Sequence, residues 1–140
     1  MSKDILFYEL TPAQDMINFM LKYSFFHKQV IQIPACVTVE KNFDFDLMKK
    51  AINVEIQRND CMRIRFKKKH GKQIQYFLDE YKLENIPVYE FSSKQEQDDL
   101  LGKDAQTPVH HMKGELFRFI LFKNSSAAIS SLSVISIYSP

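Results

Sequence analysis

The residues best suited to acid–base chemistry are two adjacent histidines, His110 and His111, followed closely by Glu115. An imidazole accepts a proton near neutral pH, and a carboxylate can orient it. The pair follows Pro108 in a polar stretch, where histidines are usually exposed and titrate ordinarily. Two adjacent ligands without a third nearby also do not make a metal site. The sequence therefore predicts a loop here, without a catalytic or metal-binding residue.

The two cysteines, Cys36 and Cys61, are the candidates for nucleophilic chemistry. Neither has a neighbouring histidine or helix N-terminus that would lower its thiol pKa. They lie far apart beside apolar residues, which predicts free, buried thiols, as in a reducing cytoplasm. His27 is expected at a helix end and His70 in a turn, and three scattered glycines cannot form a phosphate loop. We therefore expect no nucleophile and no directly bound cofactor.

The stretch QRNDCMRIRF, residues 57–66, is the third candidate, because it holds three arginines, an aspartate and a cysteine. A nucleic-acid surface would need more basic charge on one face with stacking aromatics, and the formal net charge of the chain is only +2. On pattern alone, Arg58 favours a helix C-terminus through the helix dipole. Arg63 and Arg65 are then solvated or paired on the polar side of a strand. The residue types thus indicate a helix-to-strand junction.

Two amphipathic helices are expected in the first half of the chain. Thr11 and Pro12 form a cap and first-turn pair. The helix that follows carries Met16, Met20 and Tyr23 on one side, with Ile17, Leu21 and Ser24 beside them. A second helix over residues 47–58 shows apolar residues at four-residue steps. Short apolar or β-branched runs at residues 5–10 and 30–40 predict strands, and Pro34 places the second at an edge or bulge.

The second half predicts a hairpin, a strand, a helix and a further strand. Residues 61–69 alternate apolar and basic, HGK supplies a turn, and residues 73–80 return as the second strand. Ser92 or Ser93 is expected to cap a polar helix anchored only by Leu100 and Leu101. The strand after the hairpin is expected over residues 86–93, the polar helix over 94–106 and the last strand over 114–124. This mixed order indicates an α/β or α+β fold.

Length and composition are typical of one globular domain. The chain has 140 residues, of which 45% are hydrophobic and 26% charged. The N-terminal residues include an acid at position 4 and no long apolar run, which predicts neither a signal peptide nor a membrane span. We expect a cytoplasmic protein without a nucleic-acid or membrane partner.

Residues 57–66 resemble the second core motif of condensation domains from nonribosomal peptide synthetases, usually written RHExLRTxF. Arg58, Asp60, Arg63 and Phe66 stand where that motif has Arg, Glu, Arg and Phe. The departures are Met62 for its Leu, Asn59 for its His and Ile64 for its Thr.

Two further stretches are similar to the same family. Thr11, Ala13 and Gln14 match its first core motif, SxAQ, with Thr in place of Ser. KGELFRFILFK, residues 113–123, resembles the strand that precedes the catalytic segment. The resemblance runs from Ile5 to Lys123, the front quarter to third of a full condensation domain.

The resemblance implies a partial chloramphenicol acetyltransferase-like subdomain: an α/β (α+β) sandwich with a mixed sheet and flanking helices. In full domains two such halves form a V around a tunnel, and substrates arrive on carrier proteins through phosphopantetheine. The reaction joins an acyl or peptidyl donor to an aminoacyl acceptor by amide formation.

The family's catalytic motif, HHxxxDG, is expected after the strand that follows residues 113–123, where this chain has a Ser-rich, uncharged segment. His110 and His111 mimic it, but they precede the strand, their acid is Glu115, and Leu116 stands where Gly is needed. We therefore expect no catalytic residue. We also expect a condensation-domain part over 1–124 and an atypical tail over 125–140, truncated or frame-shifted.

The resemblance assigns Arg58 and Arg63 to structural support of the active site, since the arginine corresponding to Arg63 pairs with the Asp of HHxxxDG. Two alternatives stay open: a non-catalytic module that binds a carrier or another partner, and a related acyltransferase that uses CoA or a carrier. An uncovered sheet edge also predicts self-association.

Overall fold

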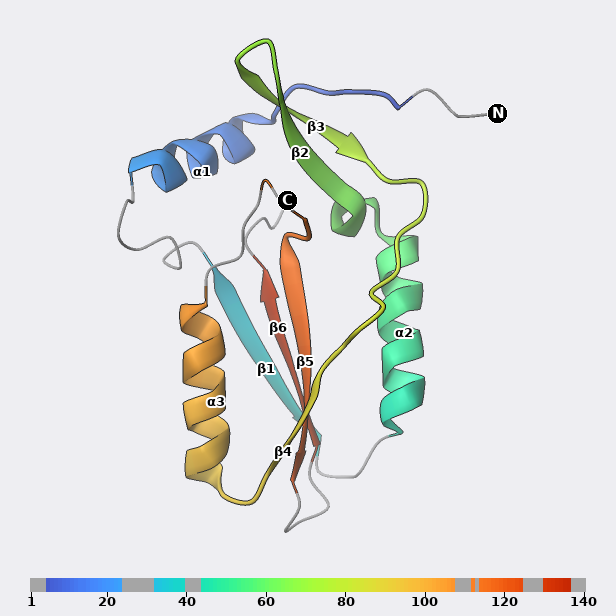
Figure 1. The fold of residues 1–140 in the computed structure, drawn as a ribbon, viewed down its shortest axis with the longest axis vertical. Helices are drawn as coiled ribbons and strands as arrows, with labels where there is room; N and C mark the ends of the chain where they lie inside the picture. The colour runs from blue at the N-terminus through green and yellow to red at the C-terminus, as the bar shows by residue number, and fades with distance from the viewer. Residues whose placement is uncertain are drawn as a thin grey trace.

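The computed structural model of the chain describes residues 5–23, 32–39, 44–107, 112, 114–124 and 130–136. His27, His110 and His111, for which the sequence predicts a helix end and a loop, lie outside these residues. The elements are, in order (Figure 1), α1 (Pro12–Tyr23), β1 (Ile33–Val39), α2 (Phe45–Arg58), the 3₁₀ helix η2 (Asp60–Arg63), β2 (Ile64–Lys69), β3 (Lys72–Phe77), β4 (Val88–Phe91), α3 (Lys94–Gln106), β5 (Phe117–Asn124) and β6 (Ser130–Ser136).

A four-stranded mixed sheet forms the centre of the fold, with the strand order β1-β6-β5-β4. β6 pairs antiparallel with both β1 and β5, whereas β4 runs parallel to β5. Parallel neighbours need a crossover connection, and α3 provides it. Part of the Ser-rich segment pairs as a strand, because residues 130–136 form β6 between two partners.

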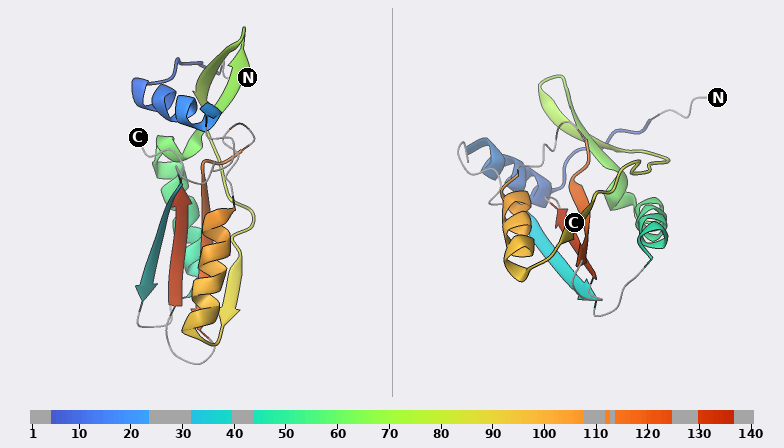
Figure 2. Two further views of the ribbon diagram at one scale, coloured as in Figure 1. Left: turned by 90° about the vertical axis from the view of Figure 1, so that its left-hand side faces the viewer. Right: turned by 60° about the horizontal axis from the view of Figure 1, so that its bottom comes forward.

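Helices α2 and α3 cover opposite faces of this sheet (Figures 1 and 2). Alternate residues of β5 point to opposite sides. Phe117 and Leu121 pack with Ile52 and Ile56 of α2, and Ile120 and Phe122 pack with Leu100 and Leu101 of α3. The expected fold, a mixed sheet with flanking helices, is confirmed, and so is the anchoring of α3 by its two leucines.

The β2–β3 hairpin forms a second, smaller sheet beside α1 (Figure 1). His70 and Gly71 turn it with positive φ values of 50° and 77°, as a two-residue hairpin requires. The predicted turn at His70 is therefore confirmed. The predicted strand at residues 5–10 is wrong apart from a single bridge between Tyr8 and Gln75, because the rest of that run has no strand partner among the described residues.

Helices α2 and α3 both begin with a side-chain cap. Asp44 accepts from the backbone N–H groups of Asp46 and Leu47 at the start of α2. Ser93, rather than Ser92, accepts from the N–H of Glu96 at the start of α3. Each bond satisfies a backbone donor that the first helical turn leaves free.

Of the two adjacent stripes that the sequence predicts on helix α1, the one with Ile17 and Leu21 faces the core. Leu21 is buried and Ile17 packs against Ile64, Phe66 and Leu116. The other stripe is exposed, as is the aromatic residue beside it; these residues are Met16, Phe19, Met20 and Tyr23. Helical spacing alone does not tell which of two adjacent apolar stripes packs inward.

Candidate functional site

Arg63 lies at the end of η2 with only 9% of its surface exposed. Its Nη1 donates to the carbonyls of Ile56, at 3.2 Å, and Gln57 in the last turn of α2. Its Nε donates to the carbonyl of Leu78 at 2.9 Å, and the Leu78 N–H donates back to the Arg63 carbonyl at 3.0 Å. These carbonyls include the ones that a helix end leaves without partners. One guanidinium thus ties the end of α2 to the residue that follows β3.

The remaining donor group of Arg63, Nη2, lies 2.5 Å from a carboxylate oxygen of Asp60. The Asp60 side chain is 74% exposed, so the ion pair is solvated on its acidic side. Arg58 is separate from this network: it pairs with Glu55 at 3.3 Å, and both side chains are mostly exposed. Of the two arginines predicted to support an active site, the structure therefore builds a network only around Arg63.

The first-core-motif residues form the start of α1. The Thr11 hydroxyl accepts from the Gln14 N–H at 3.3 Å, and the Gln14 side-chain carbonyl accepts from the Thr11 N–H at 2.8 Å. This reciprocal pair is a capping box, and it confirms the predicted cap at Thr11. Ala13 is exposed within the same turn. The motif's described contacts therefore serve to begin a helix.

Gln14 also reaches across to the hairpin. Its Nε2 donates to Oε1 of Gln75 at 2.9 Å, and the buried Gln75 in turn donates to the Glu9 carbonyl at 2.8 Å. Gln75 also exchanges two backbone bonds of 2.9 Å with Tyr8. The counterparts of the two core motifs thus converge on one strand, since Gln14 binds Gln75 within β3 and Arg63 binds Leu78 directly after it.

Arg65 is a buried cation, whereas the sequence left it either solvated or paired on the polar side of a strand. It is 7% exposed, its guanidinium stacks 4.4 Å from the centroid of the Tyr81 ring, and its Nη1 donates to the Ile64 carbonyl at 2.8 Å. Its Nη2 is buried without a hydrogen-bond partner. Burial lowers the pKa of Arg65, and Glu115 opposes that shift. The alternating pattern could not identify Tyr81 as the partner of Arg65, because Tyr81 lies on a later segment of the chain.

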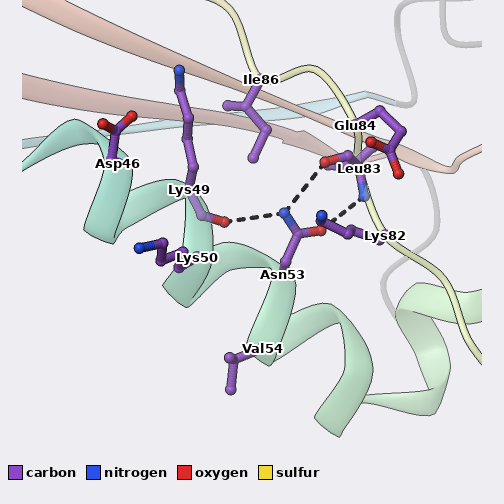
Figure 3. A pocket seen from close by; sticks show the side chains of 9 residues that line it. All are labelled: Asp46, Lys49, Lys50, Asn53, Val54, Lys82, Leu83, Glu84 and Ile86. Atoms are coloured by element: carbon purple, nitrogen blue, oxygen red, sulfur yellow. Dashed lines mark hydrogen bonds between the residues drawn. The ribbon is translucent and has the colours of Figure 1, made fainter.

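Two amides on α2 hold the extended segment before β4 in place, a contact that the sequence did not reveal. Asn53 donates to the Leu83 carbonyl at 3.3 Å and accepts from the Leu83 N–H at 2.8 Å (Figure 3). Gln57 donates to the Asp79 carbonyl at 2.9 Å. The sequence did hold one sign of this contact: Asn53 and Gln57 are four residues apart on a helix, so their side chains lie on the same face.

A groove of about 500 Å³ lies between α2 and this segment (Figure 3). Its lining includes the lysines Lys49, Lys50 and Lys82, with Asp46 and Glu84 at its sides. The side chain of Asn53 is already bonded to the backbone of Leu83, so the polar groups left to line the groove are mainly charged side chains of both signs.

Arg118 and Asp104 form the best-enclosed ion pair among the described residues. Nε of Arg118 lies 2.7 Å from Oδ1 of Asp104, with side chains 27% and 14% exposed. Arg118 Nη2 also donates to the Asp104 carbonyl at 2.8 Å. The arginine that the sequence places within an apolar strand thus joins β5 to the end of α3.

Both cysteines are free and exposed, which corrects the prediction of buried thiols. Cys36 lies on β1, an edge strand of the sheet, and Cys61 lies on η2 at the surface. Partial burial raises the pKa of the Cys36 thiol, while Lys94 lowers it and Asp98 raises it further. A raised pKa leaves less thiolate, the nucleophilic form. Within the described residues, no group of three His, Cys, Asp or Glu side chains could hold a metal ion.

Comparison with known proteins gives one consistent result. A sequence model described as "Condensation domain" matches residues 5–134. A plipastatin synthase subunit from Bacillus subtilis (strain 168) is 27% identical over 123 residues, which cover 85% of this chain and 5% of that protein.

Two solved structures share the fold. The starter condensation domain of rhizomide synthetase RzmA superposes with a TM-score of 0.82 at 19% identity, and the match covers 94% of this chain and 32% of that one. The condensation domain from Monacolin K polyketide synthase MokA gives 0.79 at 14% identity, with 96% and 30% covered. This chain therefore spans about a third of the solved domains. Among the described helices, none is long and apolar enough to cross a membrane.

Proposed function

The chain belongs to the condensation domain family, and on that premise we propose that it supplies the front third of a catalyst that forms amide bonds between carrier-bound substrates. In this reaction the acceptor's amine nitrogen attacks the donor's thioester carbonyl. A C–N bond forms, the C–S bond breaks, and the released thiol takes up the proton that the amine loses. The thiol belongs to phosphopantetheine on a carrier protein, so carrier domains are the expected partners.

The convergence of Gln14 and Arg63 on β3 carries this proposal. Both residues stand at positions of family motifs, and their contacts are with amides and carbonyls of the scaffold. Such contacts position elements and do not transfer protons. In the proposed role Arg58 and Arg63 support the active site, Thr11, Ala13 and Gln14 fix α1, and HHxxxDG is supplied by the remaining part of a condensation domain.

We propose accordingly that these 140 residues do not catalyse condensation alone. The expected arrangement is a condensation part over 1–124 and a departing segment over 125–140, although the family match runs through residue 134 and β6 lies within the sheet. A cytoplasmic location is part of the same proposal. Sequencing the gene beyond residue 140 tests the arrangement, because a shifted frame that encodes HHxxxDG supports it.

A direct test is a chimera in which residues 5–134 replace the matching third of the rhizomide synthetase starter domain. A mutant of that domain has been solved in complex with C8-CoA and Leu-SNAC, and we choose these two compounds as the donor and acceptor of the assay. We expect a folded chimera to form the amide C8-acyl-Leu-SNAC and to release CoA, and the 140-residue chain alone to form none. Product formation by the isolated chain at the chimera's rate, or a folded but inactive chimera, would contradict the proposal.

The exposed stripe of α1 favours a second candidate, a non-catalytic binding module. Phe19 and Tyr23 pack on each other at 4.4 Å between ring centroids while both remain exposed. Exposed apolar stripes of this kind mark interaction surfaces. Self-association through the β1 edge, where Ile33 and Val37 are exposed, is a related expectation. Light scattering over a concentration series measures it directly.

A further inference from the structure

The β2–β3 hairpin concentrates positive charge on one of its faces. Lys67 and Lys69 are two residues apart on β2, so their side chains leave the same face. Lys72 pairs with Lys69 in the register and shares that face, and Arg65 extends the row inward. Figure 1 shows this hairpin projecting beyond the helices and the larger sheet. The three lysines, Lys67, Lys69 and Lys72, are called the lysine face below.

The charge of the lysine face is not neutralised within the described part of the chain. None of its three ammonium groups forms an ion pair there, and all three residues are exposed. Arg65 behind them has no ion pair there either, and Glu115 is the carboxylate that acts on it. By contrast, Lys94 and Lys123 each lie within 3 Å of a carboxylate. The exposed cations of the hairpin therefore remain available to a partner.

Aromatic rings hold the lysine face in place. Lys67 Nζ lies 3.7 Å from the centroid of the Phe7 ring, and Lys69 Nζ lies 5.3 Å from the same ring. Phe7 packs edge-to-face on Tyr76 at 5.8 Å. Ile5 and Leu6, directly before Phe7, are more than half exposed. The surface thus combines ordered ammonium groups with adjacent apolar side chains.

We propose that the lysine face binds a carboxylate-rich segment of a partner protein. Along β2 the ammonium-bearing residues recur about every 7 Å, the spacing of alternate residues in an extended acidic segment. Ile5 and Leu6 offer contacts to apolar side chains beside those carboxylates. A nucleic-acid strand fits less well, because base stacking needs a free aromatic face and Lys67 already occupies one side of Phe7. This inference does not depend on the proposed condensation role.

Another explanation for the lysines is that they keep the hairpin edge from pairing with other chains. One experiment separates acidic-segment binding from edge protection. It measures the fluorescence anisotropy of labelled poly-L-glutamate mixed with the full chain, at low salt and at physiological salt. The variant is K67E/K69E/K72E. The matched control is K49E/K50E/K82E in the α2 groove (Figure 3), which lowers the formal net charge by the same amount.

The proposal expects poly-L-glutamate binding that weakens with salt and falls about tenfold or more in the hairpin variant. The affinity of the control variant for poly-L-glutamate should stay within about threefold of that of the parent chain. If the hairpin variant fails to fold by circular dichroism, K69E/K72E replaces it, because these lysines lie next to the turn and not at the Phe7 contact of 3.7 Å.

Three results would overturn the proposal. Equal losses in both triple variants would mean that only net charge matters, and no binding would leave edge protection as the explanation. Tighter binding of a charge-matched single-stranded oligonucleotide, not displaced by poly-L-glutamate, would assign the surface to nucleic acid.

Discussion

The side chain of Gln14 donates to Oε1 of Gln75 at 2.9 Å and so joins α1 to the β2–β3 hairpin. Three residues after Gln75, the Leu78 carbonyl accepts from Arg63. Residues far apart in sequence, at the start of α1 and at the end of η2, therefore fix the same strand. Gln14 and Arg63 therefore both contribute hydrogen bonds that hold β3 and the residue after it in place.

Replacing Gln14 by Ala should lower the free energy of unfolding by about 1–2 kcal/mol, because it removes the bond to Gln75 and half of the capping box. Urea denaturation measures the change. Gln95→Ala is the matched control, since the bond of Gln95 is to exposed Asp99 on its own helix. An equal effect of both substitutions would mean that the contact across to β3 is unimportant.

The Arg118–Asp104 pair should show a coupling free energy of about 1–2 kcal/mol in a double-mutant cycle with R118M and D104N. Its side chains are largely enclosed, so water screens the pair weakly. The Lys123–Glu90 pair has a similar separation of 2.8 Å but exposed side chains, and it should give less than about 1 kcal/mol. Equal couplings would show that enclosure does not strengthen the first pair.

The thiol of Cys36 should react with iodoacetamide more slowly than a free thiol at the same pH, measured by mass spectrometry in a C61S background. Its raised pKa leaves less thiolate at any given pH. Removing Lys94 with K94M should slow the reaction further, and D98N should speed it. The pH at which the alkylation rate reaches half its maximum should lie above that of free cysteine. A value at or below that of free cysteine would contradict the assigned effect of burial.

The same shift gives stability a pH dependence. Folding favours the neutral thiol, so the unfolded chain loses this proton first as pH rises. The contribution is fully present below the unfolded thiol's pKa and is lost as pH rises through the folded value. C36S should remove this alkaline component of the unfolding free energy.

Substituting His111 by Ala in the active chimera should leave the rate of amide formation within about twofold, because the two histidines are expected to lie in a loop ahead of β5. H110A provides the paired measurement. A loss of several hundredfold in a variant that still folds would make the pair catalytic.

The sequence predicted the elements whose signals are local. The four-residue steps of Met48, Ile52 and Ile56 placed α2, the His70–Gly71 turn placed the hairpin, and Ser93 began α3. Pro34 correctly marked an edge strand, since β1 ends the sheet. Each of these features depends on neighbouring residues alone.

The missed features depend on contacts between distant segments. Arg65 is buried because the ring of Tyr81 covers its guanidinium. The alternating pattern left Arg65 either solvated or paired and did not identify this partner. Gln75 and Asn53 were missed for the same reason, since a single amide gains its role only when its partner segment is in place.

The central claim is that Arg63 braces the junction of α2, β2 and β3, and R63K against R58K tests it most directly. Both substitutions keep the charge, but only the first removes a guanidinium fork that donates to three backbone carbonyls. Urea denaturation should show a loss of about 2–4 kcal/mol for R63K and less than about 0.5 kcal/mol for R58K. Equal losses for the two variants would contradict the claim.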